Sequence, residues 1–484
     1  MQYPFFIGPA YTSQSVNLDA ERCVNLYVEP SESQGAKNIA ALYPTPGIDA
    51  LGTLPLYPCR GLYEVNGRSF AVYGNAFYEI LTITPTLTYT VRGFMATDSQ
   101  PATMCSNGDA GKQVFITSGG QGYIYDLVTN AFTNVTISTL PGAHIVQGGF
   151  LDGYFLALDQ KNSALFVSDL LEGLIWDPTQ FTQRNTAQDN WIGFTVVHRE
   201  VWLCGSQTSE VWYDAGAFPF PLQPIPGAFL EQGTAAAFSV CNVNSTAMWL
   251  GRSKDGHTVV WRASGYTPQR VSTYAIEYQL SQYTTVSDAV AWTYQDQGHY
   301  FFVLTFPTAN HTWVYDTSTG FWHERGYWNG ATDDYQAQPN AFHMLIGDTH
   351  VTGDRFSGVL YAQSITSSND ANGTLLRRLR TATHLSNEQQ WMFYTQAQLD
   401  MESGLGTQTG TGQDPQVMLR TSNDGGHVFS TERWAAAGAI GAFKTRVMWR
   451  RIGRSRDRVF QVAYSEPTPW RLINFYLQVE PGTS

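Results

Sequence analysis

The sequence predicts an all-β chain with an N-terminal β-propeller and a C-terminal β-sandwich or jelly-roll domain. A loose repeat of about 45 residues runs through its first three quarters, a spacing typical of propeller blades. The clearest copies end in the aromatic strands Tyr123–Asp126, Val211–Asp214 and Trp313–Asp316. Aromatic residues reach 14%, and 44 Gly and 22 Pro residues supply many turns. Convincing helical periodicity is scarce, which completes the all-β profile.

The first segment, residues 1–58, does not repeat. It contains Val24–Tyr27 and the proline-rich stretch Leu42–Ile48. Proline lacks the backbone N–H and restricts the residue before it, so this density argues against a helix. We therefore expect an extended strap that packs on the propeller.

Blade-like units occupy residues 59–366, with typical strands at Ser69–Tyr73, Tyr154–Leu158 and Tyr300–Leu304. Several strands are apolar on both faces, as expected where blades stack on each other. The units lie at residues 60–95, 102–140, 143–182, 190–225, 233–280, 286–335 and 340–366. They predict about seven blades, or six if the last, short unit is only a linker.

A polar stretch at residues 367–373 is expected to link the propeller to a second β domain at residues 374–484. A domain of about 110 residues with closely spaced strands suits a β-sandwich or jelly roll. Its expected strands are Phe393–Leu399, Val417–Thr421, Arg446–Ile452, Val459–Tyr464 and Ile473–Val479.

Charge is divided unevenly along the 484 residues, whose net charge is -12. Residues 1–370 hold 15 basic and 31 acidic residues and carry -16, whereas residues 371–484 hold 13 basic and 9 acidic residues and carry +4. The contrast supports a domain boundary near residue 370. It also indicates docking between acidic and basic faces.

Several function classes lack their sequence signals. We find no nucleophile elbow, P-loop or dinucleotide fingerprint, and no histidines at metal-ligand spacing, so no catalytic residue, metal or cofactor is predicted. His299 and His311 are interpreted as hydrogen-bonded structural residues. There is no long apolar run for a membrane span, and Met1–Phe6 lacks the features of a signal peptide. The 5 widely spaced cysteines favour buried free thiols in a reducing cytoplasm.

Ser422–Phe429 resembles the Asp-box hairpin of sialidase-type propellers, and Ser253–Trp261 is a weaker copy. Asp-Gly turns between β runs are the commonest short hairpin signal, so we interpret both as structural turns. The clearer copy also lies outside the predicted propeller. A sialidase would in addition need an arginine triad, a tyrosine and acids at the propeller centre.

One basic segment stands out near the C-terminus. On the expected strand, Lys444, Arg446 and Arg450 share a face, while Val447 and Trp449 point the other way. Three interpretations are open: a solvated hairpin, phosphate binding, or docking onto carboxylates of another subunit. Docking is favoured because the rest of the chain is acidic. The candidate docking residues are Lys444, Arg446, Arg450, Arg451, Arg454, Arg456 and Arg458.

The last three arginines of this set are expected to follow a turn at Gly453. Arg377, Arg378 and Arg380 add to the basic count of the same domain.

Several collinear stretches carry a family resemblance. They begin with Ser15–Asn17, Arg22–Tyr27 and Pro46–Ile48, continue through Ser168–Leu170, Trp176–Pro178, Phe181, Trp191–Gly193, Val201–Ser206 and Glu210–Trp212, and end with Lys444–Arg454. In this order they resemble the packaged-DNA stabilisation proteins of short-tailed bacteriophages, also called tail hub or nozzle proteins. The resemblance spans nearly the whole chain, and its C-terminal stretch is the strongest part.

The resemblance implies a structural virion protein that is not an enzyme. Such proteins form a homo-oligomeric ring, usually hexameric, below the portal and its adaptor (head-to-tail) protein, in the virion tail. They extend the DNA channel, help retain the packaged genome, and support tail fibres, spikes or a needle. Assembly would take place in the host cytoplasm, and genomic DNA would pass without sequence-specific binding. The alternative is a virion propeller that binds or cleaves glycans, like a depolymerase or sialidase.

Overall fold

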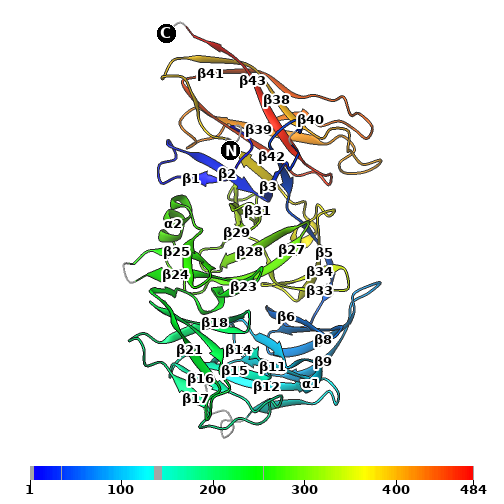
Figure 1. Ribbon diagram of the computed structural model, residues 1–484. Helices are drawn as coiled ribbons and strands as arrows, with labels where there is room; N and C mark the ends of the chain where they lie inside the picture. Colours follow the sequence, from blue (N-terminus) through cyan, green and yellow to red (C-terminus); the bar gives the residue numbers. More distant parts are fainter. Residues whose placement is uncertain (1–4, 34, 136–143, 254–255, 483–484) are drawn as a thin grey trace.

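The computed structural model describes residues 5–33, 35–135, 144–253 and 256–482. A ring of small sheets forms the larger part, and a β-sandwich projects from its rim beside β29 and β31 (Figure 1). The sandwich holds the C-terminal strands, and the first strands of the chain lie against it. The predicted all-β architecture, a propeller followed by a sandwich, is therefore confirmed.

Blades 1 to 4 each contain four antiparallel strands. They are β6 (Cys59–Val65), β7 (Arg68–Tyr73), β8 (Ala76–Thr82) and β9 (Thr88–Phe94); β10 (Thr103–Ser106), β11 (Gln113–Ser118), β12 (Gln121–Asp126) and β13 (Phe132–Val135); β14 (Ile145–Leu151), β15 (Tyr154–Asp159), β16 (Ala164–Val167) and β17 (Phe181–Gln183); and β18 (Trp191–Val197), β19 (Glu200–Gly205), β20 (Ser209–Asp214) and β21 (Leu222–Leu230).

Blades 5 to 7 are less regular. Blade 5 contains β22 (Gln232–Thr234), β23 (Cys241–Val243), β24 (Thr246–Ser253), β25 (Thr258–Ser264) and β26 (Thr267–Arg270), and blade 6 contains β27 (Val290–Asp296), β28 (His299–Phe306), β29 (His311–Asp316) and β30 (Phe321–Glu324). Blade 7 contains β33 (Asn340–Ile346), β34 (Thr349–Asp354) and β35 (Val359–Ser364), completed by β5 (Gly47–Thr53) from the start of the chain.

Strand β5 closes the propeller. It pairs antiparallel with β35, so the short last unit of the sequence is a complete blade rather than a linker. The inner strands of successive blades contact one another in a closed cycle through β6, β10, β14, β18, β23, β27 and β33. Within the described ranges this gives the seven blades that the repeat predicts.

The blades bury their apolar strands against each other. Phe70 and Val72 of β7 are completely buried and pack with Val114 and Ile116 of β11 in the next blade. A middle strand contacts neighbouring blades on both faces, so it is apolar along its whole length instead of alternating. Each such layer removes apolar surface from water, which stabilises the stacked ring.

The N-terminal segment, which we expected as an extended strap, forms strands that pair with other parts of the chain. It forms β1 (Tyr11–Thr12), β2 (Ala20–Val24), β3 (Leu26–Pro30) and β4 (Ala40–Pro44) before reaching β5. Strand β2 pairs antiparallel with β36 (Arg378–Thr381), and β4 meets β43 (Leu472–Pro481). The segment therefore completes the sandwich and one blade, because each strand satisfies its backbone groups in an existing sheet. Tyr27 of β3 also packs against Trp292 and Phe301 of blade 6, so the segment contacts the propeller as well.

The sandwich consists of two packed sheets. One has the order β3-β4-β43-β38-β41, and the other continues blade 6 in the order β30-β2-β36-β42-β39-β40. The remaining strands are β37 (Leu385–Ser386), β38 (Met392–Met401), β39 (Gln416–Ser422), β40 (Arg433–Ala436), β41 (Val447–Ser455) and β42 (Asp457–Tyr464). All five strands expected for this domain are present, with ends shifted by a few residues.

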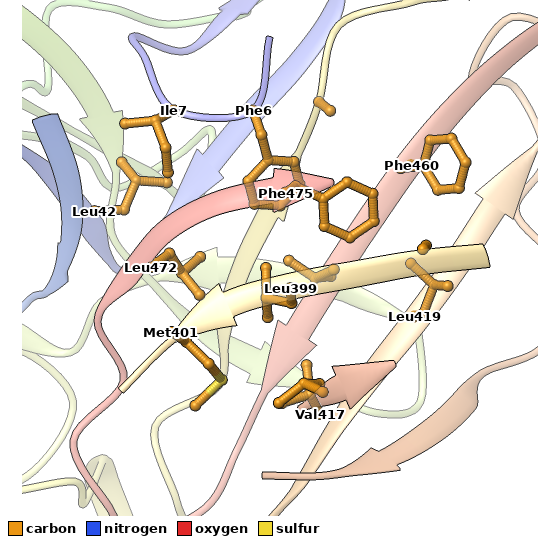
Figure 2. Close-up of a cluster of buried hydrophobic side chains, with 14 of the residues drawn as sticks. Phe6, Ile7, Leu42, Leu399, Met401, Val417, Leu419, Phe460, Leu472 and Phe475 are labelled. Atoms are coloured by element: carbon orange, nitrogen blue, oxygen red, sulfur yellow. The ribbon is translucent and has the colours of Figure 1, made fainter. Parts of the chain in front are cut away.

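Both ends of the chain meet in the sandwich core. Figure 2 shows Phe6 beside Phe475 of β43, and Ile7, Leu399 of β38 and Phe460 of β42 belong to the same cluster. The rings of Phe6 and Phe475 stack with centroids 4.8 Å apart. The sandwich core thus depends on residues outside the C-terminal domain.

The connection at residues 367–373 is part of the folded structure. Asp370 is buried, and its carboxylate accepts a hydrogen bond from the N–H of Ala371 at 2.8 Å. Burial raises the pKa of Asp370 to about 7. The backbone N–H of Ile48 donates to the carbonyl of Asn369, which ties this connection to β5. The polar residues here serve as packed turns, where the sequence predicted only a linker.

The few remaining elements lie between sheets. Strands β31 (Gly326–Asn329) and β32 (Asp334–Ala337) form a hairpin between blades 6 and 7, and the helical elements are α1 (Gly108–Gly111), α2 (Tyr274–Ser281), η1 (Ala237–Ser239) and η2 (Ala371–Gly373). In the described part of the chain, no helix is long and apolar enough to cross a membrane.

Candidate functional site

The predicted basic segment lies at one edge of the sandwich. Among the strands of the described residues, β41 is the last of its sheet and pairs only with β38. Val447 and Trp449 point into the core, while Arg450 is exposed, so the predicted alternation holds along the strand. Lys444 and Arg446 are also exposed but precede the strand.

The expected turn at Gly453 is wrong. The strand continues to Ser455, and the chain turns at Arg456. Arg451 and Gly453 have φ angles of 55° and 88°, and the register with β38 shifts between Tyr394 and Gln396. The positive φ values therefore build a β-bulge, which tilts the edge without ending it.

The aromatic residues of β38 and its flank support two of the arginines. The guanidinium carbons of Arg454 and Arg456 lie 4.6 Å and 5.0 Å from the centroid of the Trp391 ring. Such cation–π contacts orient a guanidinium while leaving its N–H edge open to a partner. Phe393, 41% exposed, extends the same surface.

Arg458 does not belong to this surface. Its side chain is 1% exposed and donates to Asn423 Oδ1 at 2.9 Å and to the carbonyls of Ile452 and Arg454 at 3.0 Å and 3.1 Å. It also stacks on the Tyr394 ring, 4.4 Å from the centroid, and burial lowers its pKa. Its partners come from other strands, so sequence spacing alone placed it wrongly among the docking residues.

The other six predicted residues share one property. In the described part of the chain, their side chains form no ion pair, whereas many arginines elsewhere are paired. They define the basic edge: Lys444, Arg446, Arg450, Arg451, Arg454 and Arg456. An exposed set of cations without intrachain carboxylates is available to an external anionic group.

Sequence reasoning missed one contributor to this edge. Arg433 of β40 donates to the carbonyls of Arg450 and Arg451 at 2.6 Å and 3.3 Å. Its own carbonyl accepts from the indole N–H of Trp449 at 2.9 Å. Arg433 thereby covers outward carbonyls of an edge strand that would otherwise be open for pairing. No local signal links it to β41, because the contact crosses between the two sheets.

The three arginines after the connection are structural. Arg380 is completely buried and donates to the carbonyls of Phe6 and Pro9 and to Glu21. Arg377 pairs with Glu432 at 2.6 Å. Burial lowers the pKa of Arg378 to about 10. Arg380 thereby ties the N-terminal segment to the C-terminal domain, and the three buried arginines add nothing to the basic edge.

The Asp-box sequence forms the structural turn that we expected. Ser422 Oγ donates to Asp424 Oδ1 at 2.6 Å. Asp424 Oδ1 also accepts from the N–H groups of His427 and Val428. These local bonds lower the pKa of Asp424, and they occupy its carboxylate within the turn between β39 and β40. In the weaker copy, Lys254 and Asp255 lie outside the described residues.

His299 is hydrogen-bonded as predicted, whereas the buried Nε2 of His311 has no hydrogen-bond partner among the described residues. The Nδ1 of His299 lies 2.6 Å from Asp316 and its Nε2 lies 2.8 Å from Glu29. The two carboxylates raise the pKa of His299, Asp316 most strongly. Among the described residues, no group of three or more His, Cys, Asp or Glu side chains has the arrangement of a metal site.

Comparison with solved structures gives only distant likenesses. PorZ, a surface component of the type-IX secretion system of Porphyromonas gingivalis, is 10% identical with a TM-score of 0.37, over 72% of this chain and 44% of that one. BamB from Moraxella catarrhalis is 11% identical with a TM-score of 0.37, over 70% and 94%. Raptor from Chaetomium thermophilum is 12% identical with a TM-score of 0.41, over 66% and 29%.

No curated protein matches the chain in sequence. Two family models do match, in the order of the domains described above. The model of the bacteriophage P22 Gp10 β-propeller covers residues 1–368, and the model of the bacteriophage P22 Gp10 β-sandwich covers residues 377–480. With its seven blades and its C-terminal sandwich, the chain therefore belongs to the bacteriophage P22 Gp10 family of phage structural proteins.

Proposed function

We propose that this chain is the tail hub or nozzle subunit of a short-tailed bacteriophage. Identical copies form a ring, most simply a hexamer, below the portal–adaptor complex. The ring extends the DNA channel, helps retain the packaged genome and supports fibres, spikes or a needle, without catalysing a reaction. The observation that carries the proposal is the match of both domains to one family of phage structural proteins.

The charge distribution supports this role. The net charge of -16 on residues 1–370 suits a wall past which DNA slides, because like charge keeps phosphates from adhering. A closed ring needs two different complementary patches on each subunit. The basic edge supplies a cationic patch, and we propose that it docks on an acidic surface of a neighbouring copy or of the adaptor. Arg458 takes no part because it is buried.

The experiment removes part of the basic edge. We expect the combined substitution of Arg450, Arg451 and Arg454 by Ala to weaken ring assembly, measured by sedimentation with the adaptor–portal complex over a range of salt concentrations. Wild-type assembly should weaken as salt rises, since exposed charges are screened over about 10 Å at 0.1 M salt. Loss of the arginines should flatten that dependence.

A matched control variant loses three positive charges from the propeller instead of from the basic edge. Lys112, Lys161 and Arg199 are exposed there, and their combined replacement by Ala should leave assembly unchanged. If the basic-edge variant assembled like wild type with the same salt dependence, the docking role would be rejected. The subunit role itself has a separate test, namely whether particles that lack this protein still retain DNA.

A further inference from the structure

A second candidate site lies on the propeller, away from the basic edge. A pocket of about 200 Å³ opens where blades 6, 7 and 1 meet. Its walls are mostly apolar and include Trp292, Phe342 and Phe356, together with Pro101 and Pro307. Residues of six separate chain segments converge on it, so it is a product of blade stacking.

Two arginines line the pocket, and one of them, Arg60, is buried and donates to the carbonyls of Gln100 and Gly74 at 2.7 Å and 2.8 Å. Arg355 lies over the ring of Phe356, with its guanidinium carbon 4.6 Å from the centroid. In the described part of the chain, this guanidinium has no hydrogen-bond or ion-pair partner, and its Nε is buried. Burial lowers the pKa of Arg355 to about 10, so the side chain is still charged at neutral pH.

In the described residues, neither nearby carboxylate forms an ion pair or hydrogen bond with Arg355. Asp354 accepts hydrogen bonds from the N–H of Phe356 at 2.7 Å, from Ser357 Oγ at 2.7 Å and from Tyr361 at 3.0 Å. Asp288 Oδ2 accepts from the N–H of Thr308 at 2.7 Å, while its buried Oδ1 has no hydrogen-bond partner among the described residues. Both attract Arg355 at longer range, but neither satisfies its donors. A partly buried guanidinium without a partner favours an external carboxylate.

The size of the pocket limits what fits. Sites that enclose a small organic ligand usually measure about 300–1,000 Å³, whereas about 200 Å³ holds roughly one large side chain. Apolar surface also continues beyond the opening, because Phe356 is 63% exposed and Tyr57, next to the lining residue Pro58, is 67% exposed. Aromatic residues and arginine are enriched at the energetic centres of protein interfaces.

We propose that this pocket docks a segment of a partner protein in which a large apolar side chain stands next to a carboxylate. The apolar side chain enters between Trp292 and Phe356, and the carboxylate pairs with Arg355. The choice of a protein partner rests on the proposed structural role in the virion. The pocket is separate from the basic edge. It is concave and receives a single side chain, whereas the basic edge docks on an acidic surface.

The test measures the binding of two blocked dipeptides to the purified full chain by ligand-observed NMR. The probes are acetyl-Trp-Glu-amide and acetyl-Trp-Gln-amide, which differ only in charge. We expect the Glu peptide to bind about fivefold more tightly, the size of one partly exposed ion pair. The substitution Arg355→Gln should abolish that difference, and Phe356→Ser should weaken both peptides. Both positions are solvent-accessible, so the fold should tolerate the changes.

Arg199→Gln is the matched control, because Arg199 is exposed and distant in the sequence, and it should leave both affinities unchanged. Equal binding of the two peptides, or a Glu preference that survives Arg355→Gln, would overturn the proposal. Tighter binding of free 3-indolepropionate than of the Glu peptide would also overturn it, in favour of a small-molecule site. These measurements need no ring assembly, so their failure is distinct from failure of the proposed function.

Discussion

Asn25 joins the three parts of the molecule, and its replacement is our principal stability prediction. Its side chain is 2% exposed, and Nδ2 donates to the carbonyls of Gly326 and Arg377, each at 2.8 Å. Oδ1 accepts from the N–H of Gly326 at 3.0 Å. One amide therefore connects the N-terminal segment, the β31–β32 hairpin and the start of the C-terminal domain.

The size of the effect follows from these contacts. Replacing Asn25 by Ala removes three buried hydrogen bonds, each worth about 1 kcal/mol net. Asn25 also has a φ of 56°, a conformation that costs Ala about 1 kcal/mol more than Asn. We expect the free energy of unfolding to fall by about 4 kcal/mol in total.

Guanidinium unfolding followed by tryptophan fluorescence measures this loss. The matched control is Asn244→Ala, because Asn244 has a φ of 47° but an exposed side chain. It should lose only the backbone contribution of about 1 kcal/mol. If the two variants lost the same stability within about 1 kcal/mol, the reasoning about the buried amide would be refuted.

Three further outcomes are expected. Arg458→Ala should lower the free energy of unfolding by about 3 kcal/mol, because it removes three hydrogen bonds of a buried side chain. The exposed control Arg456→Ala should change it by less than about 0.5 kcal/mol. Equal effects of the two substitutions in thermal melts would contradict the assigned burial. Phe6→Ala should cost about 3–5 kcal/mol as a core truncation, which a melting curve indistinguishable from wild type would disprove. Folding raises the pKa of His299 above its value of about 6.5 in the unfolded chain. Protonated His299 therefore stabilises the fold fully at pH values below about 6.5, and this stabilisation is lost as pH rises through the pKa of the folded state. Unfolding at pH 6 and pH 9 should therefore show a smaller stability difference in His299→Gln than in wild type, and identical differences would rule out this linkage.

Local pattern was sufficient for part of the basic edge. The two-residue period of a strand placed Val447 and Trp449 in the core and Arg450 outside, as observed. It failed at Arg458, because the groups that bury this side chain, Asn423 and Tyr394, come from other strands. The pocket around Arg355 had no sequence signal, since its lining residues are scattered along the chain.

The amino-acid sequence by itself determined the type of structure. The aromatic repeat, the many turn residues and the apolar runs specify short stacked strands, because strand periodicity and turn chemistry are local properties. The change from acidic to basic composition predicted a domain boundary near residue 370. The resemblance to the family came from the collinear stretches that end with Lys444–Arg454.

Only the tertiary structure decided which strands pair. Strand β5 closes blade 7, and β2, β3 and β4 enter the sandwich sheets, although all four belong to one short N-terminal segment. Backbone N–H and C=O groups are the same in every residue, so an extended segment does not specify its partner strand. The partner is chosen by which side chains the completed sheet buries, and that choice exists only once distant parts of the chain have met.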